Sequence, residues 1–237
     1  MANKIPLCYH AVAFILRPTA ALMMRKDWRG GENLRREGGF IAVSNHMSPA
    51  DPITFAHFLY SNGQAPRFLA KASLFDVPVT GWLLRKLDQI PVYRGTKRAR
   101  DALDAAAVVL ERGDMIAMFP EGTLTKDPGY WPMSARPGAA RMALEQNVPV
   151  IPVAQWGVQL LVDHREKKFK PFPRKRITVV AGPPVDLDEF RGKPLDTALL
   201  RDATTKIMAA LTSMLEEIRG ESAPQTPFDT RNRKREL

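Results

Sequence analysis

A histidine and an aspartate in one short segment could together supply a general base. The segment 45–52 reads NHMSPADP and places His46 five residues before Asp51, directly after an apolar run. On an ideal helix the two side chains would point roughly 140° apart, so they meet only if His46 precedes a helix and Asp51 lies near its start. The two prolines of the segment fit a first helical turn. Asp51 would then orient the imidazole, and His46 would take a proton from a bound hydroxyl group.

The nucleophile of such a reaction is expected to be a hydroxyl group of the substrate. Ser48 is the nearby alternative, but the chain has no G-x-S-x-G motif, and a serine at this position is typical of a helix cap. A purely structural interpretation is also open, in which Asp51 only caps the helix and His46 packs beside it. A metal site is the weakest alternative, because the remaining histidines are scattered without ligand spacing.

Two further segments could bind an anion. The segment 90–95, IPVYRG, ends an expected strand in Arg94, which could hold a phosphate through two parallel hydrogen bonds. The segment 119–123, FPEGT, forms a tight polar turn. There Gly122 and Thr123 could offer a backbone N–H and a hydroxyl to a phosphate or a hydroxyl-bearing acceptor, and Glu121 could orient an arginine or a substrate hydroxyl. The alternatives are a solvated charge at Arg94 and an ordinary β-turn at 119–123.

These three segments must be positioned by strands of one sheet. Short apolar runs predict strands, and helical patterns lie between several of them. The predicted strands are Phe40–Ser44, Arg67–Ala70, Gln89–Tyr93, Met115–Phe119, Val150–Gln155 and Arg176–Ala181. The predicted helices are Thr54–Tyr60, Gly81–Leu87, Ala99–Arg112, Gly138–Gln146 and Asp196–Arg219. This alternation predicts a single α/β domain with a mostly parallel central sheet flanked by helices, with chemistry at the carboxyl ends of the strands.

The charge of the chain is concentrated in two segments. The 237 residues contain 35 Lys and Arg against 25 Asp and Glu, which gives a net charge of +10. Residues 1–30 carry a net +4 and residues 163–176 a net +5. Such local excess indicates a polyanionic partner: nucleic acid, an anionic membrane or a phosphorylated substrate. No nucleic-acid-binding motif is apparent, and the single cysteine, Cys8, excludes an intrachain disulfide and a Cys-cluster zinc site.

The ends of the chain differ in character from its middle. Residues 5–16 read IPLCYHAVAFIL and are flanked by basic residues, but the run is too short to span a bilayer. We expect residues 1–30 to be a membrane-associated helical segment lying at an interface, with a helix packed on its own domain as the alternative. Residues 31–220 would form the folded domain, and the polar residues 221–237 a disordered tail.

The segments taken together resemble the glycerolipid acyltransferase family, and most closely its bacterial 1-acyl-sn-glycerol-3-phosphate acyltransferases. The likeness rests on NHMSPAD, IPVYR, FPEGT and VPVIPV (148–153), in this order and spacing, and covers roughly residues 40–185. The resemblance implies His46 as the general base, Asp51 as its partner, Arg94 at the phosphate and Glu121, Gly122 and Thr123 at the acceptor. It further implies Lys71 and Arg136 as basic residues of the substrate site.

The same resemblance implies transfer of a fatty acyl group from acyl-CoA or acyl carrier protein to a lysophospholipid hydroxyl, giving phosphatidate. No metal or organic cofactor is implied. The expected partners are the two substrates and an anionic membrane surface, with acyl carrier protein as a possible donor. The expected location is peripheral, on the cytoplasmic face of the cell membrane. Another lyso-lipid acceptor is the first alternative, and a basic nucleic-acid-binding protein is a distant one.

Overall fold

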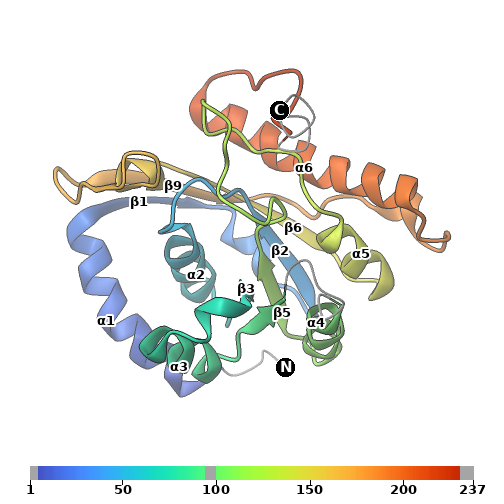
Figure 1. The fold of residues 1–237 in the computed structure, drawn as a ribbon, viewed down its shortest axis with the longest axis horizontal. Helices are drawn as coiled ribbons and strands as arrows, with labels where there is room; N and C mark the ends of the chain where they lie inside the picture. Colours follow the sequence, from blue (N-terminus) through green and yellow to red (C-terminus); the bar gives the residue numbers. More distant parts are fainter. Residues whose placement is uncertain (1–4, 94–99, 230–237) are drawn as a thin grey trace.

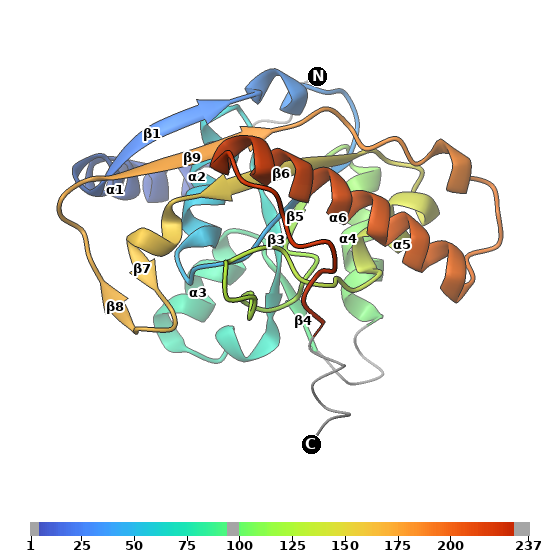
Figure 2. The same cartoon turned by 90° about the horizontal axis from the view of Figure 1, so that it is seen from above.

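The computed structural model describes residues 5–93 and 100–229 of the chain. Within them, one seven-stranded sheet has the strand order β1-β9-β6-β2-β5-β3-β4 (Figures 1 and 2). Its strands are β1 (Met24–Arg29), β2 (Phe40–Ser44), β3 (Arg67–Lys71), β4 (Ile90–Val92), β5 (Met115–Met118), β6 (Val150–Trp156) and β9 (Lys175–Ala181). The helices are α1 (Leu7–Met23), α2 (Asp51–Ser61), α3 (Pro78–Lys86), α4 (Asp101–Glu111), α5 (Gly138–Glu145) and α6 (Thr197–Arg219). The predicted α/β domain with a mostly parallel sheet is confirmed.

The parallel part of the sheet brings the predicted segments to one edge. Strand β2 lies at the centre and pairs in parallel with β5 on one side and β6 on the other. Strand β3 pairs in parallel with β5 and with β4. The carboxyl ends of β2, β5, β3 and β4 therefore share one edge, and the segments that follow them meet there.

Helices cover both faces of the sheet, and the side chains of β2 pack alternately into the hydrophobic cores on the two faces. Phe40 and Ala42 pack with apolar residues of α1 and α2, whereas Ile41 and Val43 pack with those of α4, α5 and α6. All four side chains are fully or almost fully buried. This continuous burial is typical of a parallel strand covered on both faces, and it explains the unbroken apolar run in the sequence.

The segment expected to be helical over residues 1–30 is divided between a helix and a strand. Helix α1 continues through Pro18 and ends at Met23, and the chain then enters β1, which pairs in parallel with β9. Residues 24–29 thus belong to the sheet of the main domain. Among the described residues, none of the helices combines the length and the apolar character needed to cross a bilayer.

Two other regions differ from the prediction. A hairpin of β7 (Val162–Asp163) and β8 (Lys168–Phe169), which sequence analysis did not identify, precedes β9. The tail expected to be disordered from residue 221 is ordered in its first part, because Ala223 N–H donates to Glu216 and Ser134 N–H donates to the Phe228 carbonyl. Residues 230–237 lie outside the described residues.

Candidate active site

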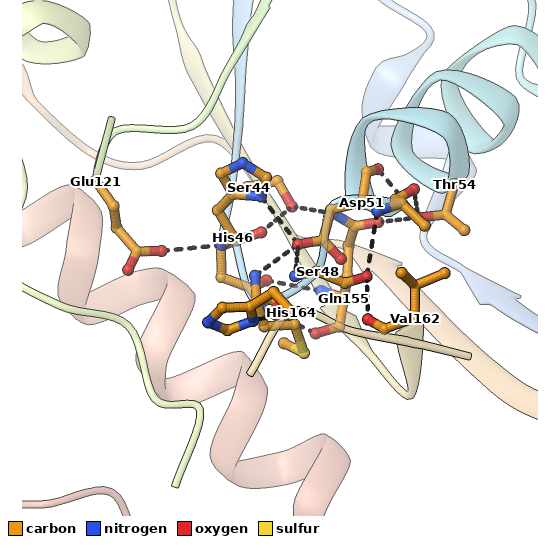
Figure 3. A network of polar contacts seen from close by, with 12 residues as sticks. Ser44, His46, Ser48, Asp51, Thr54, Glu121, Gln155, Val162 and His164 are labelled. Carbon is orange, nitrogen blue, oxygen red and sulfur yellow. Dashed lines mark hydrogen bonds and ion pairs between the residues drawn. The ribbon is translucent and has the colours of Figure 1, made fainter. Parts of the chain in front are cut away.

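The predicted histidine–aspartate pair forms at the end of β2 (Figure 3). His46 lies in the loop before α2, Asp51 is the first residue of that helix, and His46 Nδ1 lies 3.0 Å from Asp51 Oδ2. The same oxygen accepts hydrogen bonds from the backbone N–H groups of Met47 and Ser48. Asp51 is fully buried, and this burial raises the pKa of its carboxyl group against the opposing effect of His46. Because Nδ1 is engaged, Nε2 is the ring nitrogen that can accept a substrate proton.

The imidazole of His46 is further fixed by an aromatic ring. Its plane stacks on Phe119, which follows β5, with 4.1 Å between ring centroids and 19° between planes. Two partners on different elements, one polar and one aromatic, restrict the ring to one orientation. The side chain remains 17% exposed, so the base is accessible from the cavity described below.

Glu121 has a different place from the one expected for a residue that contacts substrate. Its carboxylate is buried, and it accepts the His46 backbone N–H at 2.9 Å and the Met133 backbone N–H at 3.0 Å. Burial raises the pKa of Glu121 to about 8, although both N–H groups oppose this rise. Glu121 thus supports the backbone of the general base from behind, and direct contact with the acceptor stays a prediction.

A polar network that the sequence did not reveal holds the end of β2 against β6 and α2. Asn45 exchanges two hydrogen bonds with the backbone of Gln155, at 2.8 and 3.0 Å. The Gln155 amide donates to the Ser44 hydroxyl and accepts from the Thr54 hydroxyl at 2.7 Å. All four side chains are buried, and a satisfied buried network of this kind specifies one geometry. The one sequence signal for this network was the polar Gln155 inside an otherwise apolar strand.

An apolar cavity of about 700 Å³ opens beside His46. Side chains of α1, α2, β3 and α3 line it, among them Val12, Ile53, Phe68 and Leu84. Such walls and such a volume suit a long hydrocarbon chain.

Most of the predicted binding residues lie at this cavity. Lys71, at the end of β3, and Gly122, Thr123 and Arg136 all contribute to its lining. A Cβ at Gly122 would lie 3.5 Å from Arg136 Nε, and Gly122 has a φ of +70°, which favours glycine. The structure thus brings Arg136 onto the turn at 119–123. Arg94 lies outside the described residues, although β4, which leads to it, pairs with β3 beside Lys71.

The backbone N–H groups near His46 and Gly122 would be natural candidates to bind the oxyanion that develops in acyl transfer. The structure gives those groups other acceptors: His46 N–H donates to Glu121, Met47 and Ser48 N–H donate to Asp51, and Gly122 N–H donates to the Phe119 carbonyl. Lys71, Thr123 and Arg136 are residues of the cavity lining whose side chains carry hydrogen-bond donors. They therefore replace the backbone groups as candidate oxyanion donors.

Comparison with known proteins identifies the family. Residues 25–156 match the family model described as Acyltransferase, which is more than half of the chain. The chain belongs to the Acyltransferase family. The match contains His46, Asp51, Lys71, Arg94, Glu121, Gly122, Thr123 and Arg136, and it ends with β6.

Curated proteins that resemble this chain are named 1-acyl-sn-glycerol-3-phosphate acyltransferases. The chain is 33% identical over 135 residues to the chloroplastic 1-acyl-sn-glycerol-3-phosphate acyltransferase BAT2 of Brassica napus, covering 56% of this chain and 38% of that protein. It is 24% identical over 209 residues to the Bacillus subtilis 1-acyl-sn-glycerol-3-phosphate acyltransferase, covering 84% and 96%. The matched part of this chain spans between about a third and three fifths of the length of the first curated relatives.

A solved structure shares the fold of this acyltransferase. The crystal structure of the 1-acyl-sn-glycerophosphate (LPA) acyltransferase PlsC from Thermotoga maritima aligns with a TM-score of 0.67 at 24% identity. The alignment covers 91% of this chain and 84% of that one, so the shared fold extends beyond the family match.

Proposed function

We propose that this acyltransferase moves a fatty acyl group from an acyl thioester to the free hydroxyl of 1-acyl-glycerol-3-phosphate, giving phosphatidate. The donor would be acyl-CoA or acyl carrier protein. The observation that carries the proposal is that His46, paired with Asp51, lines an apolar cavity whose lining also includes Lys71 and Arg136. A base, an apolar volume that suits an acyl chain and two cations that suit a phosphate therefore adjoin one cavity, which supports the proposal.

The proposed reaction has a simple proton balance. His46 Nε2 accepts the proton of the acceptor hydroxyl as its oxygen attacks the thioester carbonyl carbon. Asp51, held by Met47 and Ser48, stabilises the imidazolium that forms. The carbon–sulfur bond then breaks, and the imidazolium returns the proton to the leaving sulfur, which departs as a thiol. This sequence of steps requires no metal or organic cofactor.

The apolar outer surface supports a membrane as the place of the reaction. On α1 the side chains of Leu7, Phe14 and Ile15 are exposed, and on α3 those of Val79 and Trp82. The same two helices line the cavity from their inner sides. We propose that this end of the molecule rests on the cytoplasmic face of the cell membrane, so that a lipid acceptor passes between α1 and α3 without crossing water.

An acyl-transfer assay tests the proposal. Purified wild type and His46→Ala would be given lysophosphatidate and acyl-CoA or acyl carrier protein, with free thiol and phosphatidate both measured. We expect the two products in equal amounts from the wild type and none above background from the variant. His10→Ala serves as a matched control, because His10 is an exposed histidine of α1 that does not line the cavity. Equal turnover by wild type and His46→Ala would refute the role of the base.

A second acceptor class is distinguished by substitution of the three basic residues that were predicted from the sequence to bind the acceptor. If the acceptor carries a phosphate, Lys71→Ala, Arg94→Ala and Arg136→Ala should raise the KM for lysophosphatidate with less effect on the KM for acyl-CoA. An unchanged acceptor KM in all three variants would favour a lyso-lipid without a phosphate at this position.

A further inference from the structure

The β7–β8 hairpin presents aromatic and basic side chains to solvent. Phe169 is 59% exposed and Phe172 is 68% exposed. Residues 163–176, which contain both, carry seven basic and two acidic side chains. Lys168 and Lys170 both pair with Glu166, so two cations share one carboxylate and the hairpin keeps its positive charge. Exposed aromatic side chains surrounded by lysine and arginine are typical of contact with an anionic bilayer.

The hairpin lies at the same end of the molecule as α1. Figure 2 places β7 and β8 on the same side of the molecule as α1, and the chain runs from β8 to the start of β9 at that side. Arg174, just after the hairpin, donates to the Met24 carbonyl at 2.9 Å, and Arg25 and Arg176 are opposite each other in the β1–β9 ladder. The pairing of β1 with β9 therefore joins the two basic segments of the sequence into one surface.

The inner end of the hairpin contacts the loop that holds the general base. The Ser48 hydroxyl donates to the Val162 carbonyl at 2.7 Å, and His164 Nδ1 donates to the Met47 carbonyl at 2.9 Å (Figure 3). Met47 and Ser48 are the two residues that follow His46 and whose N–H groups hold Asp51. A displacement of the hairpin would thus act on both partners of the catalytic pair.

We propose that the hairpin, residues 162–172, is a second membrane-binding element that couples bilayer docking to the catalytic loop. Phe169 and Phe172 enter the head-group region of an anionic bilayer, and Lys168 and Lys170 contact its phosphates. The two hydrogen bonds to Met47 and Ser48 then hold the loop in its catalytic geometry when the hairpin is docked. Docking stands independently of the reaction, whereas the coupling rests on the proposed function.

The docking half is tested by flotation of the full chain with vesicles of phosphatidylcholine alone and with added phosphatidylglycerol. We expect wild type to bind the anionic vesicles. The double variant Phe169→Ser/Phe172→Ser should bind them with an affinity at least about tenfold lower. Val108→Ser is the matched control, because Val108 is an exposed apolar residue on α4 and should leave binding unchanged. Unfolding midpoints equal to wild type would exclude a folding defect at these exposed positions.

The charge contribution has its own matched pair. Lys168→Gln/Lys170→Gln should weaken binding to anionic vesicles roughly fivefold or more. Lys193→Gln/Arg201→Gln removes the same charge from exposed positions away from the hairpin and should have little effect. Vesicle binding that survives in the hairpin variants, with loss of binding to acyl carrier protein instead, would make the hairpin a protein-docking site and overturn the proposal.

The coupling half is tested at His164, a positioning residue. We expect anionic vesicles to stimulate acyl transfer by wild type relative to detergent micelles, and His164→Leu to bind vesicles normally but lose the stimulation. His164→Gln, which keeps an N–H donor, should restore part of it. Equal stimulation of wild type and His164→Leu would refute the coupling. Absence of acyl transfer in every assay, with hairpin-dependent flotation intact, would refute the proposed function and leave the docking element standing.

Discussion

The two faces of the sheet are both covered by helices, but they are packed differently. The face under α4, α5 and α6 has a core of fully buried apolar side chains such as Ile207 and Leu211, and we call it the closed face. Of these three helices, α4 and α5 border the cavity through Ala102, Leu103 and Gly138, and α6 does not line it. The face under α1, α2 and α3 contains a cavity of about 700 Å³ and has exposed apolar side chains on the outer sides of α1 and α3. We call the face with the cavity the open face. Incomplete packing lowers stability, so we infer that the open face is shaped by ligand binding and that the closed face contributes most of the stability of the fold.

The largest expected effect is on the chemistry at the open face. Asp51→Asn should lower kcat by about 10³- to 10⁴-fold, because an amide cannot hold the imidazolium and favours the wrong tautomer. Steady-state kinetics with lysophosphatidate would measure the loss. Asp127→Asn is the control, since Asp127 is a buried carboxylate outside the catalytic pair. A kcat within threefold of wild type for Asp51→Asn would remove the pair from the mechanism.

Truncation of one leucine on each face should lower the free energy of unfolding by different amounts. Leu211→Ala, on the closed face, should lower the free energy of unfolding by about 2–5 kcal/mol. Leu84→Ala should cost clearly less, because Leu84 already borders the cavity and has fewer neighbours to lose. Urea unfolding of both variants gives the comparison. Equal losses would mean that the cavity closes around Leu84 in solution.

Enlargement of one alanine on each face should give a second contrast. Ala106→Leu, fully buried on α4, should destabilise the protein by about 1–3 kcal/mol through overpacking. Ala56 of α2 lines the cavity, so Ala56→Leu should change the free energy of unfolding little. The added side chain should shorten the cavity and shift the substrate preference toward shorter acyl chains. A panel of acyl-CoA chain lengths would show this shift, and an unchanged preference would place the acyl chain elsewhere.

The smallest expected effect concerns the buried carboxyl group of Glu121, which follows β5 and contacts the backbone of His46. The pKa of Glu121 is raised to about 8 in the folded protein, so the folded chain binds this proton more tightly than the unfolded chain does. The free energy of unfolding should therefore fall by about 1.6 kcal/mol as pH rises from about 6.5 to 8. Urea midpoints across this range would show the slope.

Glu121→Gln is the variant that checks the assignment. It should abolish the Glu121 part of that slope, because the amide does not titrate. It should also lower stability, since the glutamine oxygen can accept from only one of the His46 and Met133 N–H groups and the NH₂ group leaves the other without an acceptor. The same slope in Glu121→Gln and wild type would assign the pH dependence to another group.

The sequence predicted the central strands and the catalytic pair because both are local signals. β2 is an unbroken apolar run, and His46 and Asp51 are separated by only five positions around a helix start. β1, with the sequence MRKDWR, was missed because an edge strand is buried on one side only and tolerates charge. The role of Glu121 was also out of reach, since its partner His46 is 75 residues away and the contact is to the backbone.

The hairpin and the start of the tail were missed for a similar reason. Their order depends on tertiary contacts, such as that of Ser48 with Val162 and that of Ser134 with Phe228, rather than on local pattern. Polar residues 163–168 carry no period that would distinguish a short hairpin from a loop.

The pairing of β1 with β9 has a consequence for the order in which the chain can fold. Helix α1 and β1 are made early in synthesis, but Met24 finds its partner only when Lys175 has left the ribosome. Until then β1 has no partner strand, although Tyr9 of α1 can already bond to Pro66, Leu87 and Gln89. The edge of the sheet next to α1 is therefore completed late, and a bilayer surface is available to the exposed side of α1 before that edge has formed.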